Sequence, residues 1–305
     1  MYIDILITKE PESNKSLEDI AKKLLRAAGV GETLPTPQDD IIKCAELVKG
    51  GQINLDDYDE SFINKVNNAL SSGWRKWKGM LFIRERTIYI KPDVPESQIP
   101  FITFHEVGHK VIPWQKDAYY FDDNYSLSPE VEWEFDKEAN YISAQLIFQG
   151  RRFEKEARDY KLSIETGIKL AQDYGASCHS TLWQYVSTNT SVCTLLVMKE
   201  GNYNEMIDGM SNKPFLLQYI VPSPPFKEEF GTIKWKRKFS PEHEFVVVAK
   251  GLNDNIVKGE TILENKNGEK VKLIFEAWSN KYNVFVLIYK KPKISLLKKQ
   301  VILTK

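Results

Sequence analysis

Cysteine is scarce in this chain of 305 residues, and the three present, Cys44, Cys178 and Cys193, never form a Cys-x-x-Cys pair. Such an odd, scattered set of thiols excludes a disulfide framework and is typical of proteins in a reducing compartment. The chain also lacks an apolar run of the roughly 18 residues that a membrane-spanning helix needs. Its first residues carry no basic segment of a signal peptide. We therefore expect a cytoplasmic protein with no membrane partner.

An excess of charge of one sign is absent as well, because 42 Lys and Arg balance 42 Asp and Glu. The halves differ: residues 1–150 hold 17 basic and 25 acidic residues, and residues 151–305 hold 25 basic and 17 acidic ones. We interpret this asymmetry as two solvated surfaces, since no dense cluster of Lys and Arg with base-reading residues is visible. Direct DNA binding by the basic half is the alternative, and it is not favoured.

Histidine is also rare, and two of the four histidines belong to one short motif. The segment 101–113, FITFHEVGHKVIP, contains the pattern His-Glu-x-x-His, with His105, Glu106 and His109 at its fixed positions. On a helix, residues four apart lie one turn apart on the same face, so both imidazoles can bind one zinc ion. Glu106 would then stand beside the metal, where a general base can take a proton from water.

Local signals favour a helix over this motif, because Pro100 suits a first turn and Pro113 cannot continue the helix. The segment between them is largely apolar, as in a buried helix. A pattern of three fixed positions also arises by chance or through core packing. Two of only four histidines around one glutamate are hard to explain in that way, so we predict a metal site.

We expect the third metal ligand to come from the next helix. Ser128 is suited to cap that helix, Pro129 to its first turn and Gly150 to its end. The body of the helix reads EVEWEFDKEANYISAQLIFQ. By the chemistry of their carboxylates, four residues are candidate ligands: Glu132, Glu134, Asp136 and Glu138.

A strand pair, then HEVGH, then a helix containing DKEANYISAQLIF resembles the ImmA/IrrE family of metallopeptidases. The resemblance implies a gluzincin-like site, in which the third ligand precedes a supporting Asp or Asn by four residues. Asn140 matches the supporting residue and Asp136 the ligand, and this spacing places them on one face of the helix. Glu138 is the fallback ligand, although it is rotated by about 200° from Asp136 around the helix axis.

The chain departs from the family pattern in two places. The family ligand is more usually Glu, so the shorter Asp136 requires its helix to lie closer to the metal. The usual apolar ending of the helix, which contains Pro, is replaced by QLIFQG at 145–150. The cofactor that the resemblance implies is Zn²⁺, with Mn²⁺ as the alternative.

The residue patterns predict an α+β fold in three parts. Residues 1–150 are expected to form a mainly helical, zincin-like metallopeptidase domain with a small β-sheet. Residues 151–190 are expected to form a helical module similar to a helix-turn-helix. Residues 191–305 are expected to form a β-rich domain. Its position resembles that of the sensor-like C-terminal domain of three-domain family members, which implies a sensory or regulatory role.

Individual elements follow from periodicity and from Gly and Pro signals. In the first part we predict helices over 16–28, from Thr36 to about Lys49, and over 59–71, with strands over 80–83 and 87–90. In the last part, the predicted strands are 192–198, 215–221, 232–238, 245–250, 261–263, 270–277 and 282–289.

The resemblance implies a zinc-dependent metalloendopeptidase that cleaves a specific protein partner, such as a helix-turn-helix transcriptional repressor. The intact Glu106 favours catalysis, because a binding module needs no base at that position. The short Asp136 keeps the alternative open, a non-catalytic regulator that binds a repressor or another partner through a peptidase-like scaffold.

Overall fold

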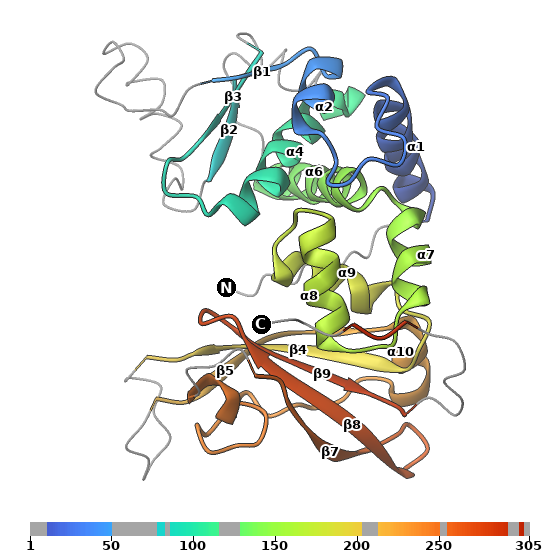
Figure 1. Cartoon of the computed structure of the whole chain (residues 1–305), viewed down its shortest axis with the longest axis vertical. Helices are drawn as coiled ribbons and strands as arrows, with labels where there is room; N and C mark the ends of the chain where they lie inside the picture. Colours follow the sequence, from blue (N-terminus) through green and yellow to red (C-terminus); the bar gives the residue numbers. More distant parts are fainter. Residues whose placement is uncertain are drawn as a thin grey trace. The chain divides into compact units, whose positions relative to one another are not determined.

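The computed structural model describes residues 11–50, 78–82, 86–115, 129–202, 213–250, 255–291 and 299–301. The chain divides into two compact units (Figure 1), the first made of residues 1–153 and 173–177, the second of residues 154–172 and 178–305. Helices and sheets occur together, so the predicted α+β class is confirmed. The division into three parts stays a prediction. In the segments described, no helix has the length and apolar character needed to cross a membrane.

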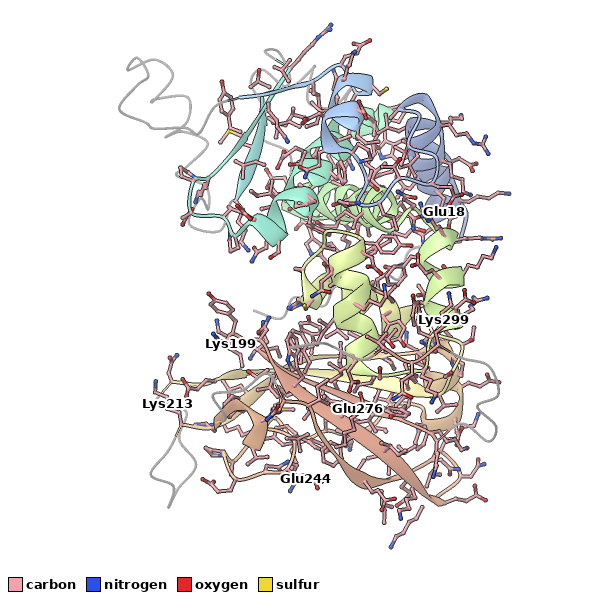
Figure 2. All side chains as sticks on the ribbon, viewed as in Figure 1. Glu18, Lys199, Lys213, Glu244, Glu276 and Lys299 are labelled. Carbon is pink, nitrogen blue, oxygen red and sulfur yellow. The ribbon has the colours of Figure 1, made fainter. Side chains whose placement is uncertain are left out.

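The first unit is mainly helical. Its helices are α1 (Pro11–Ala27), α2 (Gln38–Cys44), α4 (Ile99–Val111) and α6 (Pro129–Phe148), and the 3-10 helix η3 (Glu96–Gln98) precedes α4. Helix α1 packs against α6, where Tyr141 donates a hydrogen bond of 3.1 Å to Glu18. Figure 2 labels Glu18 on α1. The helix predicted over 16–28 is thus confirmed.

A three-stranded sheet in the same unit has the order β1-β3-β2. Strand β2 (Gly79–Phe82) runs antiparallel to β3 (Thr87–Ile90), and β1 (Val48–Lys49) runs parallel to β3. The predicted strand pair is confirmed. Both β2 and β3 contact α4, so this sheet lies beside the helix that carries the histidine motif.

The predicted end of the second helix, at about Lys49, is wrong. Helix α2 stops at Cys44, because Glu46 adopts a left-handed φ of 57° and the chain then enters β1. Residues 48–49 form a strand because they pair with β3, although their local pattern favours a helix. Because the pairing joins segments distant in the sequence, no local signal indicates it. The helix predicted over 59–71 lies outside the described residues.

The second unit holds a six-stranded antiparallel sheet of order β6-β5-β4-β9-β8-β7. Most of α7 (Arg151–Asp159) and α8 (Ile164–Asp173) belongs to this unit, together with α9 (Cys178–Ser187), α10 (Pro224–Phe230) and the 3-10 helix η5 (Val247–Lys250). The strands are β4 (Cys193–Glu200), β5 (Phe215–Pro222), β6 (Lys238–Phe239), β7 (Val257–Glu264), β8 (Lys270–Ser279) and β9 (Val284–Tyr289).

The central strands of this sheet are buried on both faces. On one face, Leu196 and Met198 of β4 join a core to which α10 contributes Phe226. On the other face, His179 of α9 packs edge-on against Phe285 of β9. Double coverage explains why β9 is apolar at every position, whereas the edge strand β7 alternates between exposed and half-buried residues.

Several strand predictions in this unit are confirmed and others are wrong. The run 245–250 is not a strand, since residues 247–250 form η5, and of the run 232–238 only Lys238 lies in a strand. Residues 224–230 form α10, with the Ser223 side chain accepting the Phe226 N–H and Pro in the first turn. The pair of prolines after Ser223 is therefore the start of a helix.

Candidate metal centre

Helix α4 presents both histidines of the motif on one face. The rings of His105 and His109 have centroids 4.6 Å apart and planes that meet at 86°. Their Nε2 atoms lie 3.0 Å apart. The helix predicted over this motif is confirmed, and it brings two imidazole nitrogens to one point.

A close approach of α4 to α6 brings the third group. A methyl group added at Gly108 would lie 2.9 Å from the Cα of Ala139, so only glycine allows the two helices to pack at this distance. Three residues before Ala139 on α6, Asp136 directs its Oδ1 to within 3.6 Å of His109 Nε2 and 3.8 Å of His105 Nε2. The glycine between the two histidines therefore sets how near the acidic helix can come.

The three groups fit a divalent cation. The possible ligand atoms of His105, His109 and Asp136 all lie within 4.8 Å of one another. Zinc ligands at about 2.0 Å from the metal stand about 3.3 Å apart in a tetrahedron, and the observed separations are 3.0, 3.6 and 3.8 Å. Within the described part of the chain the group has three members, which is the number typical of catalytic zinc sites.

A buried amide fixes the protonation of His109. Gln115 Nε2 donates to two groups that can only accept, the carbonyl of Phe135 (3.1 Å) and the carboxylate of Glu138 (2.7 Å). Gln115 Oε1 must therefore face His109 Nδ1, 2.7 Å away, and that nitrogen carries the proton. The Nε2 of His109 is left with its lone pair, the form in which imidazole binds a metal.

The same arrangement holds for His105, whose Nδ1 lies 2.9 Å from the Oδ1 of Asn140. When both rings are neutral and donate their Nδ1 protons to these amide oxygens, both Nε2 atoms carry lone pairs and lie 3.0 Å apart. Two lone pairs at this distance repel unless a positive centre lies near both. The site is thus shaped to receive a cation.

The surroundings shift the pKa values of the two histidines in opposite directions. Burial, and then the charge of His109, lower the pKa of His105 to about 3. Burial also opposes the charged form of His109, but the nearby carboxylates of Asp136 and Glu106 outweigh it and raise the pKa of His109. A single proton at His109 is therefore the competitor that a metal ion must displace.

Glu106 lies beside the histidine pair, next to β2. Its side chain is buried, and burial raises its pKa to about 7, although a hydrogen bond from the backbone of Leu81 works in the opposite direction. A methyl group added at Gly79 would lie 3.3 Å from Glu106 Oε1, so the strand passes close to this carboxylate. The arrangement suits a carboxylate that accepts and releases a proton.

The structure distinguishes between two of the four acidic candidates on α6. Asp136 joins the group of possible ligands, whereas Glu138 is buried and accepts hydrogen bonds from Trp114 Nε1 (2.7 Å) and Gln115 Nε2 (2.7 Å). Sequence reasoning missed Gln115, which is fully buried behind His109. No motif marks it, and its position just after Pro113 is the only hint that it follows the metal helix closely.

Comparison with known proteins finds a matching family model and a solved structure with a similar fold. The model of a peptidase family described as the IrrE N-terminal-like domain matches residues 62–182. A transcriptional regulator of Mycobacterium tuberculosis has a similar fold, with a TM-score of 0.51 and 10% identity over 91% of this chain and 89% of that chain. No match was found among the curated proteins. The family match confirms the resemblance predicted from HEVGH and the acidic helix after it.

Proposed function

On the premise that residues 62–182 form an IrrE N-terminal-like domain of the ImmA/IrrE family, we propose that the chain is a zincin-like metalloendopeptidase. Its cofactor is Zn²⁺, with Mn²⁺ as the alternative. The observation that carries this proposal is the pair of facing Nε2 atoms of His105 and His109, 3.0 Å apart, with the Asp136 carboxylate within 3.8 Å of both.

In this proposal each side chain has a defined role. His105, His109 and Asp136 hold the metal, and a bound Zn²⁺ supplies Lewis acidity and lowers the pKa of water to about 7. Glu106 takes the proton of the attacking water and passes it to the leaving amine. Its buried position next to β2 places the base beside a strand whose second edge has no partner among the described strands, where an extended peptide can add.

The substrate we propose is one specific protein partner, a helix-turn-helix transcriptional repressor. The support for it is the family resemblance, together with a structural neighbour that is itself named a transcriptional regulator. The peptidase would then act in gene regulation by removing a repressor, and it need not degrade proteins in general.

The Glu106→Gln variant tests the proposal. It keeps the shape of the side chain and removes the base, so the metal content should stay while cleavage stops. The control is Glu96→Gln, the same substitution at an exposed residue of the same unit. Protein N-termini are mapped by mass spectrometry in source cells that produce each form in place of the native chain.

We expect new N-termini within one transcription factor in cells with the wild type and with Glu96→Gln, and none with Glu106→Gln. The same N-termini in all three strains would overturn the peptidase proposal.

A non-catalytic regulator is the second candidate function. The observation in its favour is Asp136, whose side chain is 56% exposed and whose oxygen stays at 3.6 Å or more from both imidazole nitrogens. If the protein only binds its partner, Glu106→Gln should retain the full effect on the target gene. Quantifying the transcript of that gene in the same strains distinguishes the two functions.

A further inference from the structure

A row of hydrogen-bonded polar side chains extends from the Nδ1 side of His109, away from its Nε2. His109 Nδ1 donates to Gln115 Oε1 over 2.7 Å, and Gln115 Nε2 donates to Glu138 Oε2 over 2.7 Å. Trp114 Nε1 donates to the same Oε2 over 2.7 Å. Gln115 and Glu138 are both buried, so these hydrogen bonds form away from water.

The last acceptor in this row is the carboxylate of Glu138, so His109 is supported by an amide that is itself bonded to a charged group. An ionised carboxylate polarises the amide that donates to it, and the amide oxygen becomes a stronger acceptor for the next proton. That acceptor is bonded to His109 Nδ1–H, so electron density is pushed toward His109 Nε2. Carboxylates that bond directly to a ligating histidine act in this way.

From this geometry we propose that Gln115 and Glu138 are positioning residues that fix the tautomer of His109 and strengthen its bond to a divalent cation. Glu138 is then not a ligand but the charge that acts on a ligand through an intervening amide. The inference rests on the metal site of the proposed function, and it does not depend on peptidase activity.

The orientation of the Gln115 amide, which lies between His109 and Glu138, also determines which nitrogen of His109 carries the proton. Gln115 Nε2 is held by the carbonyl of Phe135 (3.1 Å) as well as by Glu138, so the amide cannot turn without leaving a buried acceptor unpaired. His109 is thereby kept in the form with a proton on Nδ1 in the metal-free protein. Binding of the cation requires no change of tautomer.

Three variants of the full-length protein test the proposal. Gln115→Met removes the acceptor with little change in volume. Glu138→Gln keeps an oxygen for both donors but removes the charge. The double variant Q115E/E138Q exchanges the carboxylate and the amide, so that residue 115 accepts from His109 directly. Affinity for Zn²⁺ is measured by competition with a chromophoric chelator, and circular dichroism reports folding of the metal-free forms.

We expect Gln115→Met to bind Zn²⁺ roughly 10–100-fold more weakly, and Glu138→Gln about tenfold more weakly. The exchanged double variant should return to within about threefold of the wild type, because a carboxylate again supports His109. The matched control is Glu96→Gln, the same substitution at an exposed position of the same unit, and its affinity should not change.

Wild-type affinity in both Gln115→Met and Glu138→Gln would overturn the inference, as would an exchanged variant no better than Glu138→Gln. If Gln115→Met fails to fold, Glu138→Gln and the exchanged variant still decide. A wild type that binds no Zn²⁺ would overturn this inference and the metal site together. Loss of the peptidase proposal alone would instead appear as zinc binding without any cleavage that depends on Glu106.

Discussion

Each unit of the molecule contains a polar cluster, and the two clusters differ in what completes them. In the first unit, the Asp136 carboxylate lies within 3.8 Å of the Nε2 atoms of both His105 and His109. In the second unit, Glu276 lies in the middle of the β-rich unit, 2% exposed (Figure 2). Here the chain supplies every partner itself.

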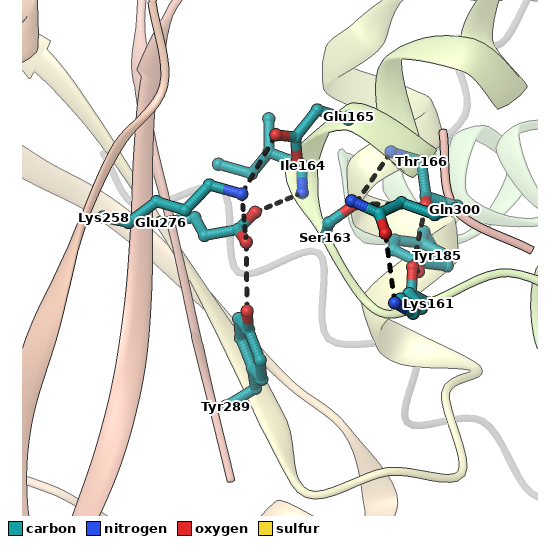
Figure 3. Close-up of polar contacts among 10 residues, drawn as sticks. All are labelled: Lys161, Ser163, Ile164, Glu165, Thr166, Tyr185, Lys258, Glu276, Tyr289 and Gln300. Carbon is teal, nitrogen blue, oxygen red and sulfur yellow. Dashed lines mark hydrogen bonds and ion pairs between the residues drawn. The ribbon is translucent and has the colours of Figure 1, made fainter. Parts of the chain in front are cut away.

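Glu276 has donors on both of its oxygens (Figure 3). Its Oε2 accepts the backbone N–H of Ile164, the first residue of α8, over 2.8 Å. Its Oε1 accepts the hydroxyl of Tyr289 over 3.0 Å and lies 3.1 Å from Lys258 Nζ. Lys258 also pairs with Glu165 over 3.0 Å. A carboxylate at the N-terminus of a helix is favourable, so this cluster holds α8 on the sheet.

The difference between the clusters shows how a binding site is told from a structural network. Lys258 is a cation that belongs to the chain, and with it the Glu276 cluster is complete. The possible ligand atoms of His105, His109 and Asp136 lie within 4.8 Å of one another, and the counterpart that we propose for them is a metal ion from solution. Burial of charge alone does not distinguish the two.

Zinc should therefore stabilise one unit and not the other, and this is the largest effect we expect. At a free Zn²⁺ concentration of about a thousand times the dissociation constant, opening of the first unit should cost about 4 kcal/mol more. Hydrogen exchange with mass spectrometry should show added protection in peptides from α4 and α6 and none in β8 and β9. The variant His109→Ala should lose the effect; equal protection in both units would contradict the comparison.

Loss of Glu276 should destabilise the second unit and leave the first unit unchanged. Glu276→Ala leaves the Ile164 N–H and the Tyr289 hydroxyl buried without their acceptor, at a cost of roughly 3 kcal/mol to the second unit. Denaturant unfolding, with Glu260→Ala as an exposed control on β7, measures this cost. Zinc affinity in the same protein should stay within about twofold of the wild type. A large loss of zinc binding would mean that the two clusters are coupled.

The close approach of α4 and α6 gives the next largest effect. Gly108→Ala places a methyl group 2.9 Å from the Cα of Ala139, so it should destabilise the first unit by about 2 kcal/mol and weaken zinc binding as Asp136 moves away. In a helix without such a contact, the same substitution stabilises by about 1 kcal/mol. The sign of the change in a thermal unfolding experiment therefore decides whether this contact sets the position of Asp136.

These features differ in how far the sequence could predict them. His105 and His109 depend only on the four-residue spacing of one helix, which is local geometry. Asp136 was selected because it lies one turn from Asn140, again a local relation once the resemblance had identified Asn140. Gln115 could not be found in this way, since its contacts with His109 and Glu138 arise from the packing of three segments.

The second unit shows the same limit. Residues 195–198 of β4 and all of β9 are continuous apolar runs, so the sequence pattern indicates these two central strands. The run 245–249 is also apolar, but residues 247–250 form the 3-10 helix η5, and Phe245, Val246 and Val248 belong to the core of one face of the sheet. Periodicity alone cannot distinguish a buried strand from another short buried segment.

The smallest effect that we expect is the pH dependence of stability that Lys258 gives to the second unit. A lysine can lose its charge at high pH, whereas a metal ion cannot. Burial opposes the charge of Lys258, but Glu165 and Glu276 outweigh burial, so its pKa is raised. The folded protein thus holds this proton to higher pH than the unfolded chain, whose lysine has a pKa of about 10.4. The resulting stability is complete below that pH and is lost as pH rises through the folded pKa.

Lys258→Arg removes this titration, because the guanidinium stays charged. The melting temperatures of wild type and Lys258→Arg should therefore diverge only above about pH 10.4, with the wild type losing more. Since the side chain of Lys258 is 51% exposed, the difference should stay below about 1 kcal/mol. Parallel melting curves up to the highest pH at which the protein folds would show that Glu276 is held by its neutral donors, and that Lys258 is not the cation that completes this cluster.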